Sequence, residues 1–173
     1  MHLNINNKIN ITLCGMMGSG KSSIGKILAK KLNYNFIDVD KLIENEANKT
    51  IKKIFEEDGE VYFRDLEEEI TIKILNNKET IVSLGGGAII NKKIRKFIEK
   101  NSYNIYLKVD VDILTKRLQN SRNRPLIYKT DLKTELINLI YKRKKFYQKA
   151  DLIIQNEKNI IETTEDIIKK IVN

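Results

Sequence analysis

The eight residues Gly15-Met16-Met17-Gly18-Ser19-Gly20-Lys21-Ser22 decide how this chain is expected to fold. They match the pattern G-x-x-x-x-G-K-[ST], in which glycines let the backbone wrap a phosphate with its amide hydrogens pointing inward. An apolar run at 9–13 precedes the loop and an amphipathic run at 21–32 follows it. This strand–loop–helix context predicts a nucleotide-phosphate site and disfavours an ordinary glycine-rich turn.

The loop residues have distinct expected roles. We expect Lys21 to reach the β- and γ-phosphates of ATP and the Ser22 hydroxyl to bind Mg²⁺, while the following helix contributes the positive end of its dipole. Cys14, directly before the loop, is expected to belong to the strand core rather than to act as a nucleophile. The predicted nucleotide-binding residues of the loop are Gly18, Ser19, Gly20, Lys21, Ser22 and Ser23.

The rest of the chain alternates short apolar runs with longer amphipathic ones, which predicts an α/β fold. Strands are expected at 9–13, 35–39, 80–84, 103–109 and 152–155. Helices are expected at 21–32, at 112–118, at 132–147, at 162–172 and, in pieces with a break at Asp58-Gly59, over 41–77. No repeat or linker is recognisable, so we expect one domain over 1–173.

Composition narrows the class of protein. The 173 residues are 41% hydrophobic and 32% charged, which is typical of soluble globular proteins. No apolar run approaches the roughly 20 residues of a membrane span, and the N-terminus lacks a signal-peptide pattern. The single cysteine fits a reducing compartment, so we expect a cytoplasmic protein without membrane contact. The one histidine, His2, makes histidine catalysis and histidine metal sites unexpected.

The net charge of +9 is compatible either with an anionic partner or with compositional drift. Basic residues are spread along the chain without an aromatic-interleaved block, so we expect no nucleic-acid partner. Lysine dominates, and each arginine therefore hints that a planar, bidentate donor was needed, with a structural salt bridge as the alternative. Six of the 32 basic residues are arginines: Arg64, Arg95, Arg117, Arg122, Arg124 and Arg143.

Two carboxylates lie at the end of the second predicted strand. Asp38 and Asp40 are two apart, and such side chains share a face of a strand. Ligands of α/β sheets bind at the carboxyl ends of strands, so one aspartate could support a metal ion and the other contact an acceptor hydroxyl. The alternative is that Asp40 caps the N-terminus of a helix beginning at Lys41. Position alone leaves both readings open.

Several further stretches occur in a specific order: Phe36-Ile37-Asp38-Val39-Asp40, Ile54-Phe55 with Gly59-Glu60, Phe63-Arg64-Asp65-Leu66-Glu67, Gly85-Gly86-Gly87 and Arg124-Pro125-Leu126. In order and spacing they resemble shikimate kinases, from Ile9 to about Gln155. The resemblance implies ATP-dependent phosphorylation of the 3-hydroxyl of shikimate, on the pathway to aromatic amino acids. It also implies a P-loop kinase fold, a three-layer sandwich whose five-stranded parallel sheet is flanked by helices. A substrate-binding helical insert would span about 41–77 and a mobile lid about 119–131.

The resemblance also implies roles for single residues. Asp40 would meet the acceptor hydroxyls, and Asp38 would support Mg²⁺ together with Ser22. Arg64 and Arg143 would bind the shikimate carboxylate. The backbone of Gly85, Gly86 and Gly87 would face the same substrate. Arg117 would stack near adenine, and Arg124 would reach the transferring phosphate from the lid. The expected catalytic residues are thus Lys21, Asp40 and Arg124, in a monomer that uses ATP and Mg²⁺.

Two other functions compete with this interpretation. A gluconate kinase would share the phosphate loop but would need no paired arginines for a cyclic carboxylate. A nucleic-acid-binding ATPase would use the positive charge. A guanine-specific switch protein is disfavoured, because neither Asn76-Asn77-Lys78-Glu79 nor Asn91-Lys92-Lys93-Ile94 supplies an Asn-Lys-x-Asp element.

The second carboxylate-binding arginine can be aligned in two registers. Counting back from Ala150-Asp151 selects Lys142, whereas counting forward to Tyr147 selects Arg143. Helical periodicity places Arg143 near the middle of an apolar stripe and Lys142 outside it. A lone arginine on an apolar face requires an anionic partner, which predicts Arg143 as the binding residue. The alternatives are a snorkelling side chain and a pairing with an internal carboxylate. The stripe consists of Leu136, Leu139, Ile140 and Tyr147.

Overall fold

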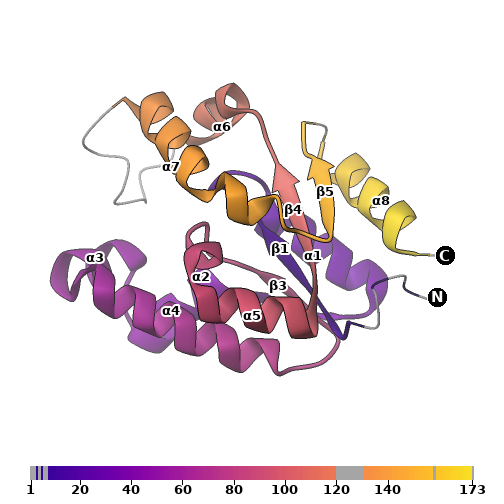
Figure 1. Ribbon diagram of the computed structural model, residues 1–173, viewed down its shortest axis with the longest axis horizontal. Coiled ribbons are helices and arrows are strands. Elements are labelled where there is room, and N and C mark those ends of the chain that lie inside the picture. Colours follow the sequence, from indigo (N-terminus) through magenta and orange to yellow (C-terminus); the bar gives the residue numbers. More distant parts are fainter. Residues whose placement is uncertain (1–2, 4, 6–7, 120–130, 158, 173) are drawn as a thin grey trace.

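The computed structural model describes residues 3, 5, 8–119, 131–157 and 159–172. Its centre is one five-stranded sheet, with the strand order β2-β3-β1-β4-β5 and parallel pairing throughout (Figure 1). The strands are β1 (Asn10–Cys14), β2 (Asn35–Asp38), β3 (Thr80–Ser83), β4 (Ser102–Lys108) and β5 (Leu152–Gln155). Because the strands are parallel, their carboxyl ends lie at one edge of the sheet, and the loops that follow them meet there.

Helices cover both faces of the sheet. On one face lie α1 (Lys21–Leu32) and α8 (Ile160–Ile171), which share an apolar cluster with β1 and β4. The opposite cluster is formed with α2 (Val39–Ala47), α3 (Ile51–Glu57), α4 (Gly59–Leu75), the 3₁₀ helix η1 (Ala88–Ile90), α5 (Lys92–Asn101), α6 (Val111–Leu118) and α7 (Leu132–Tyr147). The predicted three-layer α/β fold with a five-stranded parallel sheet is confirmed.

Successive side chains of the central strands point to opposite faces of the sheet and so belong to different apolar clusters. Ile11 and Leu13 of β1 belong to the cluster under α1 and α8, whereas the side chain of Thr12 lies on the other face. There its hydroxyl donates to Asn104 Oδ1 of β4 at 3.0 Å. Both polar side chains are buried, and this hydrogen bond satisfies them between neighbouring strands.

Several predicted elements have the observed bounds, namely the helices at 21–32 and 132–147 and the strand at 152–155. No helix or strand was predicted for residues 88–101, where the structure has η1 and α5. Asn91 caps α5 by accepting from the backbone N–H groups of Lys93 and Ile94. Ile94 and Ile98, one turn apart, are buried, so the helical signal was present in the sequence.

One prediction about the second strand was wrong. Asp38 and Asp40 do not share a strand face, because β2 ends at Asp38 and α2 begins at Val39. The N-cap is Asp38, whose Oδ1 accepts from the backbone N–H of Lys41 at 3.4 Å. Asp40 therefore lies in the first turn of α2. Helix capping, the alternative considered for Asp40, is carried out by Asp38.

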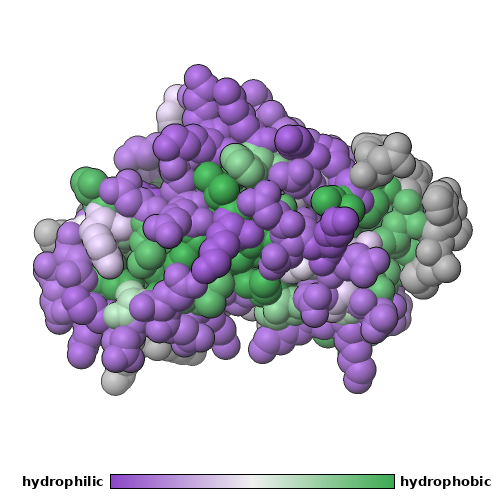
Figure 2. Space-filling model, turned by 90° about the horizontal axis from the view of Figure 1, so that it is seen from below, coloured by the Kyte–Doolittle hydropathy of each residue, from purple (hydrophilic) through white to green (hydrophobic). Residues whose placement is uncertain are grey.

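Figure 2 shows the face that is seen from below Figure 1, where hydrophilic side chains cover most of the surface and hydrophobic ones appear between them. Large exposed hydrophobic side chains include Val61, Tyr62 and Tyr141. Within the described ranges, no helix has both the length and the apolar character that a membrane span requires.

Asn10 fastens the amino end of β1, far from the edge where the loops meet. Its Nδ2 donates to Leu75 O at 3.2 Å and to Asn77 O at 2.7 Å, and its Oδ1 accepts from Thr80 N at 3.1 Å. The side chain is fully buried. It thus joins the first strand to the connection between α4 and β3.

We expect Asn10→Ala to lower the free energy of unfolding by about 2–3 kcal/mol, because buried backbone groups lose their partners. Urea unfolding measures the change, with the exposed Asn138→Ala as the matched control, which we expect to change stability by less than about 0.5 kcal/mol. Equal stability of the two variants would contradict this role for Asn10.

Candidate active site

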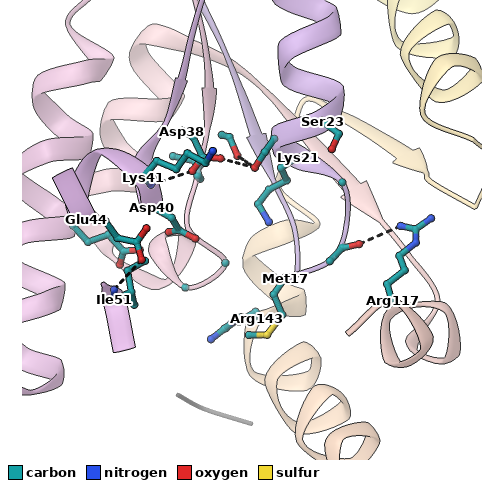
Figure 3. Close-up of a pocket in the computed structure, with 18 of the residues that line it drawn as sticks. Met17, Lys21, Ser23, Asp38, Asp40, Lys41, Glu44, Ile51, Arg117 and Arg143 are labelled. Carbon is teal, nitrogen blue, oxygen red and sulfur yellow. Dashed lines mark hydrogen bonds between the residues drawn. The ribbon is translucent and has the colours of Figure 1, made fainter. Parts of the chain in front are cut away.

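A pocket of about 860 Å³ opens where the loops meet (Figure 3). In this view Lys21 lies between Asp40 on one side and Arg117 on the other. The pocket is lined by the predicted residues Gly18, Gly20, Lys21, Ser22, Ser23, Asp38, Asp40, Arg64, Gly86, Gly87, Arg117 and Arg143. Two predicted residues, Ser19 and Gly85, do not line it. Arg124 and nearly all of the predicted lid, 119–131, fall outside the described residues.

The phosphate loop has the backbone conformation that its glycines predict. Gly15, Gly18 and Gly20 have φ angles of 145°, 76° and 87°, which L-residues with side chains rarely adopt. Lys21 extends back along the loop, and its Nζ donates to Gly15 O at 3.0 Å and Met16 O at 2.9 Å. Because α1 begins at Lys21, its N-terminal dipole and this ammonium group both favour an anion at the loop.

Cys14 and Ser19 face inward. Cys14 ends β1 and is buried, and burial raises the pKa of its thiol to about 12. The thiol therefore stays protonated, as expected of a core residue. Ser19 is 1% exposed, so its side chain does not reach the pocket. Its carbonyl instead serves as an anchor point of the loop.

That anchor is Asn156, which follows β5. Its Nδ2 donates to Ser19 O at 2.7 Å, and its backbone N donates to Lys108 O at 2.7 Å. Its Oδ1 accepts from Thr163 Oγ1 at 2.8 Å. Sequence reasoning left this residue unassigned, because no local pattern reveals a contact between positions so distant in the chain. Asn156 thus ties the phosphate loop to β4, β5 and α8.

A second hydrogen bond to the phosphate loop comes from α6. Arg117 Nη1 donates to Gly18 O at 3.2 Å, and its side chain lines the pocket beside the loop. Its planar guanidinium therefore lies at the phosphate-loop end of the pocket.

Ser22 and Asp38 bring two oxygen atoms together. Ser22 Oγ donates to Asp38 Oδ2 at 2.5 Å and lies 3.5 Å from Ser83 Oγ. Hydroxyl and carboxylate oxygens are the ligands that Mg²⁺ prefers, usually few in number and completed by water and phosphate. Consistent with so sparse a site, no group of three or more His, Cys, Asp or Glu residues in the described part of the chain could hold a metal ion by itself.

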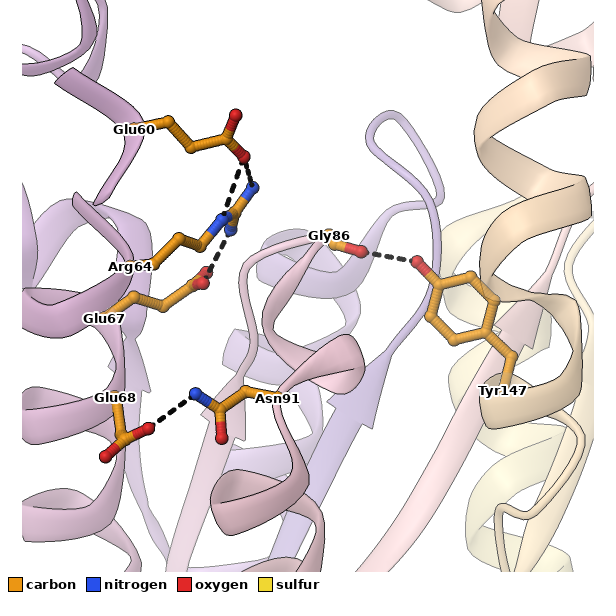
Figure 4. A network of polar contacts seen from close by, with 7 residues as sticks. All are labelled: Glu60, Arg64, Glu67, Glu68, Gly86, Asn91 and Tyr147. Carbon is orange, nitrogen blue, oxygen red and sulfur yellow. Dashed lines mark hydrogen bonds and ion pairs between the residues drawn. The ribbon is translucent and has the colours of Figure 1, made fainter. Parts of the chain in front are cut away.

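Arg64 and Glu67 form an ion pair on α4 (Figure 4). Arg64 Nη1 donates to Glu67 Oε2 at 2.7 Å, while its Nε and Nη2 donate to Glu60 Oε1 at 3.3 and 3.2 Å. A Cβ atom at Gly87 would lie 2.7 Å from Arg64 Nη1. Only glycine at position 87 therefore lets the guanidinium lie against this backbone.

Glu67 is a functional-site residue to which sequence reasoning assigned no role, although its position three after Arg64 on a helix was a usable signal. Its side chain is buried, and burial raises its pKa, while Arg64 opposes that shift and Asp40 adds to it. A Cβ atom at Gly85 would lie 2.5 Å from Glu67 Oε1 and 2.8 Å from Asp40 Oδ1. The two carboxylates therefore converge on the space that a side chain at position 85 would occupy.

Arg143 projects inward from α7 and is 3% exposed, whereas Lys142 is exposed. Its Nη1 lies 3.8 Å from Met16 Sδ. Within the described residues it forms no salt bridge, and its buried Nε has no hydrogen-bond partner. The helical periodicity thus predicted its inward orientation correctly, and the side chain does not snorkel to the surface. Its charge also acts on the buried Glu67 carboxylate, whose pKa it lowers against the larger effect of burial.

The two arginines flank the triple glycine from different helices. Arg64 of α4 lies against Gly87, and a Cβ atom at Gly86 would lie 3.4 Å from Arg143 Nη1. Two guanidinium groups beside the half-buried backbone of Gly86 and Gly87 form a site suited to a planar carboxylate, because each offers several fixed N–H donors. The phosphate loop and Asp40 lie in the same pocket. The pocket can therefore hold a phosphate donor and an acidic acceptor together.

Comparisons with known proteins agree with this geometry. The family described as shikimate kinase matches residues 17–173. A shikimate kinase of Chlorobaculum parvum is 41% identical over 170 residues, covering 93% of this chain and 91% of that protein. The structure of shikimate kinase from Acinetobacter baumannii in complex with shikimate has a TM-score of 0.91 at 31% identity, covering 95% of this chain and 93% of that one.

The similarity between this chain and a gluconokinase is limited to the fold. A gluconokinase structure from Sinorhizobium meliloti has a TM-score of 0.60 at 15% identity, covering 92% of this chain and 89% of that one. The similarity in sequence is with shikimate kinases, and it extends over most of the length of the chain. The chain therefore belongs to the shikimate kinase family.

Proposed function

We propose that this chain transfers the γ-phosphoryl group of ATP to the 3-hydroxyl of shikimate. The observation that carries the proposal is the pairing of Arg64 and Arg143 across the triple glycine, in the same pocket as Lys21 and Asp40. Membership of the shikimate kinase family supports the same substrate. Shikimate has one carboxylate, which the two arginines would bind, and ring hydroxyls, which would meet the Asp40 carboxylate.

The arginines and glycines would orient the acceptor. The guanidinium groups of Arg64 and Arg143 bind the ring carboxylate, and the backbone of Gly86 contacts the same substrate. Glu67 holds Arg64 Nη1, which fixes the direction of that guanidinium. Phosphoryl transfer depends mainly on such positioning and on the neutralisation of charge.

Asp40 and Lys21 would act at the reacting atoms. The 3-hydroxyl oxygen forms a bond to the γ-phosphorus while the bond from phosphorus to the β–γ bridging oxygen breaks, releasing ADP. Asp40 accepts the hydrogen bond of the hydroxyl and takes its proton. Lys21 stabilises the negative charge on the phosphates, and the proposed lid residue Arg124 contributes to the same task.

We assign the Mg²⁺ that accompanies ATP to Ser22 and Asp38. Their two oxygens, 2.5 Å apart, support this assignment, because they suit a hard cation and stand beside the phosphate loop. When bound, the ion supplies positive charge to the phosphate oxygens. Arg117 would pack near the adenine, on the side of the loop where it contacts Gly18.

An ADP-release assay with purified protein tests the function directly. We expect ATP turnover that depends on shikimate and on Mg²⁺ and that gluconate does not support. Turnover with gluconate but not with shikimate would favour the sugar-acid alternative. Salt-sensitive binding of nucleic acid without any shikimate turnover would favour the ATPase alternative.

Lys21→Ala and Asp40→Asn should impair the enzyme differently. Loss of the Lys21 charge should weaken ATP binding and lower kcat, each by at least about tenfold, because the ammonium group faces the phosphates. Asp40→Asn should lower kcat by about 100-fold or more while ATP affinity stays within about twofold. Steady-state kinetics and nucleotide titrations measure both effects. Normal turnover of Asp40→Asn would remove Asp40 from the reaction.

Arg143 and Lys142 provide a matched pair on one helix. Arg143→Ala should raise the shikimate KM by at least about tenfold and leave the ATP KM within about twofold, because a charge-assisted contact is lost on the acceptor side only. Lys142→Ala should be nearly silent. The reverse pattern would show that the register of the carboxylate site is wrong.

Asp38→Asn tests the metal assignment. We expect the Mg²⁺ concentration needed for half-maximal activity to rise by about tenfold or more, because a carboxylate is replaced by a weaker neutral ligand. Excess Mg²⁺ should restore part of the activity. Glu44→Gln, another acidic residue of the pocket wall, serves as the control that keeps the wild-type requirement. An unchanged Mg²⁺ requirement in Asp38→Asn would contradict the assignment.

A further inference from the structure

Tyr147 ends α7 one helical turn after Arg143 and is 1% exposed. Its hydroxyl donates to Gly86 O at 2.6 Å (Figure 4). Its ring stacks on Tyr106 of β4, with ring centroids 4.8 Å apart and an interplanar angle of 11°. The ring is therefore held by packing against Tyr106, and the hydroxyl proton is donated to the triple glycine.

Burial raises the pKa of the Tyr147 hydroxyl. The group thus remains protonated, and remains a donor, across the pH range in which proteins work. Deprotonation of the tyrosine does not weaken its contact with Gly86 under ordinary conditions.

The backbone conformation of Gly86 has to be fixed by contacts with other parts of the chain. Glycine has more conformational freedom than any other residue, and three in succession leave the loop orientation poorly determined by itself. The hydrogen bond from Tyr147 fixes the carbonyl of Gly86. The nearest atoms to a Cβ built on Gly86 are Arg143 Nη1 at 3.4 Å and Met17 N at 3.5 Å, so this backbone also lies between the arginine and the phosphate loop.

The same tyrosine reaches the phosphate loop. Met16 Sδ lies 3.8 Å from the Tyr147 hydroxyl and 3.8 Å from Arg143 Nη1. Sulfur is a weak acceptor, so these contacts add packing and direction rather than strong bonding. Arg143 and Tyr147, four residues apart on α7, nevertheless both contact the side chain of Met16.

Arg95 forms a second link between the glycine loop and α7. Its Nη1 donates to Ile89 O at 2.9 Å and Ile90 O at 2.5 Å, at the end of η1, which directly follows the triple glycine. Its Cζ lies 4.2 Å from the ring centroid of Phe146, the residue before Tyr147. This arginine has no place in the proposed reaction, and the side-chain contacts described for it join backbone carbonyls of η1 to an aromatic ring of α7.

We propose that Tyr147 is a positioning residue for the acceptor carboxylate: its hydroxyl sets the Gly86 backbone and the Arg143 guanidinium at a fixed separation, and Arg95 with Phe146 supports the same alignment. The inference rests on the proposed function, because it assigns Tyr147 to the shikimate side of that site. It predicts an effect on acceptor binding that the ATP side does not share.

The test compares Tyr147→Phe with Tyr141→Phe. Both remove one hydroxyl from α7, but Tyr141 is 84% exposed. We expect Tyr147→Phe to raise the shikimate KM by about five- to tenfold, as loss of a hydrogen bond to a partly buried carbonyl implies, with kcat and ATP KM within about twofold. Tyr141→Phe should match the wild type in all three constants. Arg95→Lys, which keeps the charge but loses the planar group, should raise the shikimate KM by a smaller factor.

A double variant separates positioning from general stability. If Tyr147 acts through Arg143, then adding Tyr147→Phe to Arg143→Ala should raise the shikimate KM by less than about twofold more. Fully multiplicative effects of the two substitutions would overturn the proposal. So would a Tyr147→Phe variant whose kcat falls with its thermal stability while its shikimate KM stays at the wild-type value. Failure of the wild type itself to phosphorylate shikimate would instead refute the proposed function.

Discussion

The ion pair between Arg64 and the buried Glu67 is the interaction around which the acceptor side of the pocket is organised. Burial of a carboxylate is tolerated when a charged partner meets it, and Arg64 does so at 2.7 Å. This contact holds the guanidinium against Gly87 and places the second Glu67 oxygen beside Asp40, above Gly85. Glycine at positions 85 and 87 thus leaves room for charged side chains of α2 and α4, and a Cβ atom at either position would displace them from the positions described.

The nucleotide side is fixed by different means. Its loop carries positive φ angles at three glycines and is held by side chains from distant parts of the chain, Asn156 after β5 and Arg117 on α6. The acceptor side depends on a helix pair, α4 and α7, that meets the glycine loop after β3. Parallel strand order brings these parts to one edge of the sheet, where they line one pocket.

Much of this could be predicted from the sequence, because its signals are local. The phosphate loop, the amphipathic helix 132–147 and the inward direction of Arg143 follow from spacing and periodicity alone. The five-stranded parallel sheet was also predicted correctly, and most of the residues that the motifs mark line one pocket. Asp38 was misjudged because a residue between a strand and a helix can end one or cap the other, and sequence does not fix the boundary. Asn156 and Tyr147 were given no role because their contacts join positions far apart in the chain, which no short pattern records. Glu67 lies only three residues after Arg64, so its spacing was visible in the sequence, but its burial was not.

The buried guanidinium of Arg143 also bears on how this protein could evolve. A charged group that is 3% exposed, with an unpartnered Nε in the described structure, lowers the stability of the ligand-free protein. An apolar residue of similar size at position 143 would pack against Leu139 and Tyr147 and relieve that strain, at the expense of the carboxylate site. Selection for thermal resistance alone would therefore favour an apolar residue at this position, so that stability and the proposed carboxylate binding place opposite demands on it.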